Sequence, residues 1–383
     1  MFQEEWRTKV PTTMSLATWS NRKVNFPSIA GPITCILLMT VTANAQDAEV
    51  DLPVEARHVR AEPYMGTWGV RILHPTAYDF NSSVNAENFD IDAFMGQIDQ
   101  LESISHVMIN INRGHQGSWW SSPYPEMAEK LDPSLFPKRD LFAELADAPR
   151  ARGLKVLVYF NGSGFDGGYL PKEIMKKWKS HCKQEGMTHY QAVSNVLEYY
   201  SLKHGKRIDG WWIDRVGGRT DEQQKDFAEA VRAGYPMGIV TMNKGGSVPT
   251  QGTPYNDYTH GHPIPMNKEA PWLGTNVRMV EKIESGPWIG ANNVPDDREG
   301  TTFGFIFMPL QAKWRDGLAG HPNEQALDWM TRTMEADGFY CWAVAREGNL
   351  FAARQFKQLL YFDLHFDPRV PAEEASPGKQ TAQ

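Results

Sequence analysis

The chain has 383 residues, of which 41% are hydrophobic and 22% are charged, and its formal net charge is −7. This globular composition supplies enough apolar material for one large core and excludes a wholly disordered chain. The acidic balance and the absence of an RNA-binding signature exclude nucleic acid as the expected partner, and no cationic run favours a membrane surface. The sequence shows no zinc-ligand spacing and no phosphate-binding Gly-rich loop, so we expect neither a metal nor another cofactor.

The N-terminal region predicts export. Residues 29–41 form an apolar run that follows several basic residues, and residues 43–45 read Ala-Asn-Ala, the small-x-small pattern of a signal peptidase site. The run is too short to cross a bilayer comfortably. We therefore expect residues 1–45 to be a signal peptide cleaved after Ala45, with the mature chain periplasmic or extracellular and without a membrane span. A buried helix or a short anchor is the alternative.

Short apolar runs recur along the rest of the chain, after a polar and acidic segment at residues 46–62 that we expect to be flexible. Continuous apolar runs of this length are typical of parallel strands that are buried on both faces. The runs occupy residues 67–73, 105–111, 154–160, 208–214, 237–242, 303–308 and 338–344. Residues 276–283 fit a strand or a helix equally well.

Between these runs, apolar residues recur at helical spacing. The predicted helices occupy residues 89–101, 141–152, 190–204, 221–233 and 324–335. This alternation of strands and helices predicts repeated βαβ units in an α/β fold, a (β/α)8 TIM-like barrel over residues 63–366. A doubly wound open sheet is the alternative architecture. Residues 367–383 are rich in Pro, Glu and Ser and are expected to be a disordered tail.

Two cysteines, Cys182 and Cys341, follow the predicted cleavage site. They either pair in an oxidising compartment or stay independent thiols, since their separation in the sequence does not show whether they meet.

In such barrels the catalytic residues lie at the carboxyl ends of the strands, so the polar residues that close the apolar runs form the candidate site. In chain order they are His74, Arg113, His115, Tyr159, Asp214, Arg215, Asn243 and Lys244. Asp214 is the strongest candidate because a carboxylate at the end of a buried strand is costly unless it is paired or used. A structural bridge from Asp214 to Arg215 or Arg113 is the alternative. Asp209 begins the same strand and is expected to be structural, at the opposite end of the barrel.

Aromatic side chains gather at the same strand ends, and aromatic faces suit the C–H faces of sugar rings. We expect Trp120, Tyr159 and Trp212 to contact a sugar, although most tryptophans of a barrel are core or wall residues. His260 and His262 have a spacing that fits a metal ion, but the sequence offers no obvious carboxylate or Cys partner, so His260 is interpreted as a substrate-binding residue.

The order of these motifs resembles that of the α-L-fucosidase family of retaining glycoside hydrolases, over about residues 64–260. WGVRILHP is similar to the family's WGxFIHWG segment and places His74 on a sugar-binding histidine. RGHQGSWWSS is similar to KHHDGFxLWxS and places His115 and Trp120 on a second histidine and a tryptophan. DGWWID is similar to the DxxWFD strand and places Asp214 on the catalytic nucleophile. TMNKGG is similar to a segment in which the family has an Asn-Arg pair.

The chain departs from the fucosidase pattern in several places. Arg215, rather than a small residue, follows the nucleophile position. In the later D-[FY]-x-T-x-E pattern, Asp257-Tyr258-Thr259 is followed by His260 and Gly261, and the Glu of a plausible acid/base region is missing. We also expect no C-terminal β-sandwich after the barrel.

The resemblance implies a retaining glycoside hydrolase that acts on an α-L-fucosyl-like or anionic glycan. Asp214 would attack the anomeric carbon, and a second carboxylic acid about 5–5.5 Å away would protonate the leaving oxygen. Glu281 and Glu284, in the sequence RMVEKIESGPW, are the candidates for this acid. A solvated helix face shared with Lys282 is the alternative for both.

The candidate site is cationic for an acidic protein, and its basic members are Arg71, His74, Arg113, His115, Arg215, Lys244 and His260. Such cations suit a sulfate or uronate group on an oligo- or polysaccharide substrate. A uronate would leave open a polysaccharide lyase or sugar dehydratase that acts by β-elimination. A non-catalytic carbohydrate-binding barrel and a metal-dependent hydrolase that uses His260 and His262 are further alternatives, and the oligomeric state stays open.

Overall fold

The computed structural model describes residues 59–73, 86–111, 121, 124–125, 137–162, 172–245, 249–262, 273–286, 288–290, 302–312 and 317–366. The predicted signal peptide, the predicted disordered tail and residues 46–58 lie outside these ranges. Four candidate site residues also lie outside them, namely His74, Arg113, His115 and Trp120.

Seven parallel strands form the central sheet, in the order β5-β4-β3-β2-β1-β9-β8. They are β1 (Thr67–Ile72), β2 (His106–Asn110), β3 (Lys155–Asn161), β4 (Gly210–Asp214), β5 (Ile239–Met242), β8 (Phe305–Pro309) and β9 (Phe339–Val344). Almost every residue in them is buried, because side chains of one face fill the interior of the curled sheet and those of the other face pack on helices. Each strand overlaps one of the predicted apolar runs.

An irregular segment at residues 256–261 joins the two edges of this sheet. The N–H of Asp257 donates to Val240 O of β5 (2.7 Å), and the N–H of Phe307 of β8 donates to Gly261 O (2.9 Å). Tyr258 forms a parallel bridge with Phe303. The segment therefore takes the sixth of eight positions around the ring. The predicted TIM-like barrel is confirmed, with an irregular sixth position.

Gly261 allows this close approach between the segment and β8. Its φ is +61°, a left-handed conformation that favours glycine, and an added Cβ would lie 2.4 Å from Phe305 O. A side chain at this position would therefore push the irregular segment away from β8.

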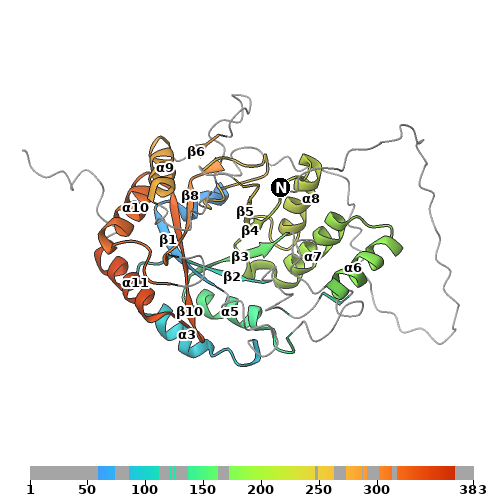
Figure 1. Ribbon diagram of the computed structural model, residues 1–383, viewed down its shortest axis with the longest axis horizontal. Helices are drawn as coiled ribbons and strands as arrows, with labels where there is room; N and C mark the ends of the chain where they lie inside the picture. The colour runs from blue at the N-terminus through green and yellow to red at the C-terminus, as the bar shows by residue number, and fades with distance from the viewer. Residues whose placement is uncertain are drawn as a thin grey trace, which may run out of the picture. The chain divides into compact units, whose positions relative to one another are not determined.

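The helices surround the sheet (Figure 1). They are α3 (Ile91–Ile98), α5 (Leu141–Arg150), α6 (Lys172–Gln184), α7 (His189–His204), α8 (Asp221–Arg232), α9 (Leu273–Glu284), α10 (Asn323–Glu335) and α11 (Ala353–His365). All five predicted helices are present, and residues 276–283 belong to α9, so they form a helix rather than a strand. No helix in the described part of the chain is long and apolar enough to span a membrane.

The remaining elements are short. The 3-10 helices are η1 (Glu62–Tyr64) and η3 (Gly205–Arg207), and the antiparallel pairs are β6 (Trp288–Ile289) with β7 (Thr302–Phe303) and β10 (Arg346–Glu347) with β11 (Leu350–Phe351). Residues 59–61, at the end of the segment expected to be flexible, are also helical. Arg60 is buried there because its guanidinium pairs with Asp257, so a tertiary contact orders this end of the segment.

The core divides into two clusters on the two faces of the sheet. The smaller cluster fills the barrel interior and is strongly aromatic, with Trp212, Phe305 and Phe339 among its members. The larger cluster lies between the sheet and the helices. Cys341 belongs to the inner cluster and Cys182 to the outer one, and both are buried, so they do not form a disulfide with each other.

Candidate active site

Asp214 is the last residue of β4, at the carboxyl end of the barrel, and its partly buried carboxylate is held by three donors. Its Oδ2 accepts a hydrogen bond from Tyr159 Oη at 2.7 Å. Its Oδ1 accepts from Asn243 Nδ2 and from the backbone N–H of Arg215, both at 2.9 Å. The three donors are uncharged groups, so they fix the direction of the carboxylate without neutralising it.

Strand register explains why these groups meet. Asp214 pairs with Asn161 of β3, and Tyr159, two residues earlier, points to the same face of the sheet. Asn243 directly follows β5, where its N–H donates to Ile213 O at 2.8 Å. The Oδ1 of Asn243 accepts from the N–H of Gly245, which turns the Nδ2 donor toward Asp214.

The backbone after Asp214 is strained. Arg215 has a φ of +57°, a left-handed conformation that costs a non-glycine residue about 1 kcal/mol or more. This turn directs the N–H of Arg215 onto the carboxylate of Asp214, and the N–H of Val216 then donates to Asn243 O at 3.1 Å. The Arg215 side chain is exposed. The hydrogen bond from Arg215 to Asp214 comes from the backbone N–H.

Opposing effects set the pKa of Asp214. Burial raises it, whereas the hydrogen bonds from Tyr159 and Asn243 and the charge of Arg71 lower it, and the net pKa lies above the usual value for Asp. The pKa of Tyr159 is also raised, first by burial and then by the charge of Asp214. Tyr159 therefore stays protonated and donates to Asp214 at neutral pH.

Arg71 lies inside the barrel, where only 3% of it is exposed. Its Cζ lies 3.7 Å from the centre of the Tyr159 ring, and its Nη2 donates to Asn110 Oδ1 at 3.0 Å. The contribution of Arg71 to the site is therefore its positive charge, which favours ionised Asp214.

Trp212 does not fit the predicted role of a sugar-stacking residue. It is fully buried, its ring stacks on Tyr159 with centroids 5.3 Å apart, and its Nε1 donates to His260 O at 2.8 Å. The alternation of side chains along β4 turns it into the barrel interior, so neither ring face is available to a substrate. Tyr159 is itself only 8% exposed, and its hydroxyl is engaged with Asp214.

His260 lies on the irregular sixth segment and is 1% exposed. Its Nδ1 accepts a hydrogen bond from the N–H of His262 at 3.0 Å, so the neutral ring carries its proton on Nε2. Nε2 has no hydrogen-bond partner within the described residues. Burial, and then the charge of His262, lower the pKa of His260 to about 3, while the charge of Asp214 raises it. His260 is therefore neutral at pH 7, contrary to the predicted cationic role.

Glu281 and Glu284 do not lie near Asp214. Glu284 ends α9 and accepts two hydrogen bonds from Arg332 of α10, both of 2.7 Å. The preceding residue, Ile283, packs against Gly304 and Gly338, which directly precede β8 and β9. These are the amino ends of parallel strands, whereas Asp214 is at a carboxyl end. Glu281 is exposed on the same last turn of α9, so neither glutamate fits the predicted role of the acid.

Lys244 follows Asn243 and is exposed at the same end of the barrel as Arg215. Asp209, as predicted, is structural: it pairs with Arg150 and accepts from the N–H of Val156 at the start of β3. Nowhere in the described ranges do three or more His, Cys, Asp or Glu side chains form a group that could hold a metal ion.

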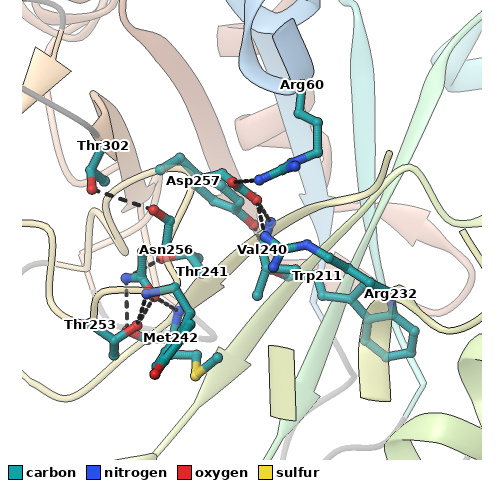
Figure 2. A network of polar contacts seen from close by, with 12 residues as sticks. Arg60, Trp211, Arg232, Val240, Thr241, Met242, Thr253, Asn256, Asp257 and Thr302 are labelled. Carbon is teal, nitrogen blue, oxygen red and sulfur yellow. Dashed lines mark hydrogen bonds and ion pairs between the residues drawn. The ribbon is translucent and has the colours of Figure 1, made fainter. Parts of the chain in front are cut away.

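A buried polar network, which the sequence analysis missed, holds the sixth segment in place. Figure 2 shows the Asp257 carboxylate between two guanidiniums, with Arg60 Nη2 and Arg232 Nη2 each 2.6 Å from it. The N–H of Val240 also donates to Asp257 Oδ2 at 2.8 Å. Next to it, Asn256 Oδ1 accepts from the N–H of Met242 at 3.0 Å. The Asp-Tyr-Thr motif before His260 was the only signal of this network in the sequence.

A parallel barrel with an oriented carboxylate at the end of its fourth strand is the arrangement found in TIM-barrel glycoside hydrolases. Residues 59–252, more than half of the chain, match the sequence profile of the endo-alpha(1,4)-fucoidanase Mef1. The chain belongs to this family of endo-fucoidanases. No curated protein is detectably similar to it in sequence.

Solved structures with the same fold include endo-fucoidan hydrolases of glycoside hydrolase family 107. The chain is similar to MfFcnA4 at 18% identity and a TM-score of 0.65, over 80% of this chain and 53% of that one. The chain is also similar to P5AFcnA, at 15% sequence identity and a TM-score of 0.67, over 80% of this chain and 92% of that one. The chain thus spans about half the length of MfFcnA4 and most of P5AFcnA.

The fold is also similar to that of alpha-L-fucosidase isoenzyme 1 from Paenibacillus thiaminolyticus. The identity is 12% and the TM-score 0.51, over 81% of this chain and 75% of that one. The resemblance to fucosidases inferred from the motifs is thereby confirmed at the level of the fold.

Proposed function

We propose that this protein is an endo-acting hydrolase of sulfated fucan that works with retention of configuration and uses Asp214 as its nucleophile. The observation that carries the proposal is the Asp214 carboxylate, oriented by three uncharged donors at the carboxyl end of the barrel. Membership of the endo-fucoidanase family supports the choice of substrate.

Asp214 is suited to attack on an anomeric carbon. In the first step a carboxylate oxygen of Asp214 bonds to that carbon while the bond to the leaving oxygen breaks, and the leaving oxygen takes a proton. In the second step water displaces Asp214 and loses a proton. Burial weakens the solvation of the carboxylate and raises its pKa, and both effects make it a stronger nucleophile once it is ionised.

His260 is the proposed group that exchanges the proton. It stands at the end of the Asp-Tyr-Thr motif, where the fucosidase pattern continues to a Glu, and Asp214 acts on its pKa. Its Nε2 is buried and has no hydrogen-bond partner within the described residues, so the proposal requires that substrate binding brings a sugar oxygen to this atom. A sulfate group of the bound substrate would add negative charge beside His260, which raises the pKa of a histidine and favours its protonated form.

The exposed cations at this end of the barrel support an anionic substrate. Arg215 and Lys244 flank Asp214 and Asn243 in the chain and have exposed side chains. They suit the sulfate groups of sugars on either side of the cleaved bond. Arg71 is buried and has a different role, since its charge acts on Asp214.

The test compares the purified protein with its Asp214→Ala variant on a sulfated fucan and on the same polymer after chemical desulfation. We expect new reducing ends and a rapid fall in polymer size on the sulfated fucan only, no rise in ultraviolet absorbance, and no activity in the variant. Fluorescence labelling of early products would show a range of lengths if cleavage is internal. A rise in absorbance would mean elimination, and sugar binding without turnover would mean a binding protein. Either result would overturn the proposal.

We further propose that the protein is exported, because a fucan polymer is too large to enter a cell intact. The apolar run and the Ala-Asn-Ala sequence before Gln46 support this proposal. N-terminal sequencing of the protein recovered from the periplasm or medium should begin at Gln46. A cytoplasmic protein with its first residues intact would contradict it.

A further inference from the structure

Helix α6 (Lys172–Gln184) carries an unusual concentration of positive charge. Lysines stand at positions 172, 176, 179 and 183, at alternating spacings of four and three residues. Residues at these spacings lie above one another on one side of a helix. The side chains of Lys176, Lys179 and Lys183 are exposed, and we call these three residues the lysine stripe.

The lysines of the stripe repel one another. Like charges three or four residues apart destabilise a helix, and Lys176 and Lys183 form no ion pair within the described residues. The chain as a whole is acidic, with a net charge of −7, so the charge of the stripe is opposite in sign to that of the whole chain. A polyanion lying along α6 would remove this repulsion.

The helix holds the lysine stripe in a fixed orientation. Trp178 and Cys182 of α6 are buried in the outer core, at 1% and 5% exposed. The stripe therefore flanks the buried side of an anchored helix. At 1.5 Å per residue, Lys176 and Lys183 are separated by about 10 Å along the helix axis, with Lys179 between them.

The chain path places one end of the lysine stripe at the catalytic end of the barrel. α7 carries the chain from that end back to the start of β4, so its first residue, His189, lies on the catalytic side. α6 ends four residues before the cap of α7 at Thr188, and the N–H of Met187 closes the turn onto Cys182 O at 2.8 Å. Lys183 is therefore close to the first turn of α7.

The first residue of α6, Lys172, is a limited distance along the chain from the site. Asn161, the last residue of β3, pairs in register with Asp214. Lys172 follows Asn161 by eleven positions, so the two residues lie no more than about 40 Å apart. A polysaccharide that occupies the site at Asp214 can be long enough to reach α6.

We propose that the lysine stripe is a remote binding surface for the sulfate groups of an extended sulfated polysaccharide, outside the residues that surround the cleaved bond. The inference rests on the proposed function for the identity of the chain that is held. Ion pairs of exposed lysines are screened by solvent, so the stripe favours long substrates and its effect weakens with salt. The stripe would strengthen binding of the polymer and would not affect the reaction at Asp214.

The experiment uses the full chain with Lys176→Gln, Lys179→Gln and Lys183→Gln combined. The matched control combines Lys206→Gln, Arg354→Gln and Lys357→Gln, which removes three exposed positive charges from η3 and α11. On high-molecular-weight sulfated fucan at low salt, we expect the KM of the stripe variant to rise about tenfold while kcat changes little. On short sulfated fuco-oligosaccharides the KM should barely change. Lys→Arg at the three stripe positions should restore the native KM.

The same substitutions in an Asp214→Ala background separate this inference from the proposed function. Binding to sulfated fucan and to its desulfated form is measured by affinity electrophoresis at increasing salt. Weaker, less salt-dependent binding in the stripe variant alone would support the inference even if the native protein failed to cleave fucan. Equal losses in the control variant, equal losses on short substrates, or no loss at all would overturn it while leaving the proposed function intact.

Discussion

Two aspartates at different positions in the barrel, Asp214 and Asp257, are held in opposite ways. Asp257 is fully buried and lies between the guanidiniums of Arg60 and Arg232. Asp214 is partly exposed, and its hydrogen-bond donors among the described residues are the neutral groups of Tyr159, Asn243 and the Arg215 backbone, while the charge of Arg71 also acts on it. The structural carboxylate forms direct ion pairs, whereas the carboxylate available for chemistry receives its hydrogen bonds from neutral groups. The comparison separates a structural from a reactive carboxylate in the same barrel.

The largest effect is expected when the reactive carboxylate, Asp214, is removed. Asp214→Ala should lower kcat on sulfated fucan on the order of 10⁴-fold or more, because no nucleophile remains to form the intermediate. The measurement is the rate at which reducing ends form at saturating substrate. Thermal unfolding of the variant should remain cooperative. Retention of more than a tenth of the native activity would remove Asp214 from the nucleophile role.

Asp257→Asn tests whether the Asp257 carboxylate is structural. It leaves two buried or partly buried guanidiniums without a counter-charge, and we expect the free energy of unfolding to fall by about 3–5 kcal/mol. The irregular segment that carries His260 should loosen, so activity should fall as well. Denaturant unfolding and kcat are measured together.

Asp209→Asn is the matched control for Asp257→Asn. Asp209 also combines an Arg partner with a backbone N–H of the neighbouring strand, but it lies at the amino end of β4 and is not fully buried. We expect a smaller loss of stability and nearly native activity below the unfolding transition. Equal loss of activity in both variants would argue against a specific role for Asp257 in holding His260.

Tyr159→Phe should change the pH dependence of the reaction. Asp214 attacks only when ionised, so activity rises with pH as Asp214 loses its proton, and the Tyr159 hydrogen bond lowers the pKa of Asp214. Its removal should raise this pKa, shift the acid limb of kcat/KM to higher pH, and lower kcat at pH 7 by about 10- to 100-fold. Tyr340→Phe is the control, since its hydroxyl donates to Asn276 outside the barrel interior. An unmoved acid limb would contradict the role given to Tyr159.

The smallest effect is expected for Glu284→Gln. This change removes an ion pair with Arg332 whose side chains are each about one third exposed, so stability should fall by about 1 kcal/mol or less. Activity on sulfated fucan should be native. A collapse of kcat would instead restore Glu284 as the catalytic acid and would mean that α9 moves during the reaction.

His260→Gln should distinguish proton exchange from simple binding. A variant that cannot supply a proton should lose most on the natural polymer and much less on a fuco-oligosaccharide with a phenol as leaving group, which departs without one. Its pH profile should also lose the limb that depends on His260. Equal losses on both substrates would mean that His260 only binds the sugar.

Much of the fold was predictable because it depends on local patterns. The strands of a parallel barrel are buried on both faces, so β1 to β5, β8 and β9 appear as continuous apolar runs. The sixth position left no such run. Its residues 256–261 are largely polar, because Asn256, Asp257 and Thr259 use side chains as well as backbone to bridge β5 and β8. Periodicity alone does not detect a strand position built this way.

The sequence by itself determined the barrel, the position of Asp214 at the end of β4 and the nature of its neighbours Tyr159 and Asn243, because residues at the ends of parallel strands converge at one edge. Only the tertiary structure decided which way each side chain faces and what it contacts. It turned Trp212 into the interior, placed Glu284 at the far end of the barrel and left His260 buried and neutral. The physical reason is that burial, pairing and pKa depend on residues distant in the chain, which no local spacing encodes.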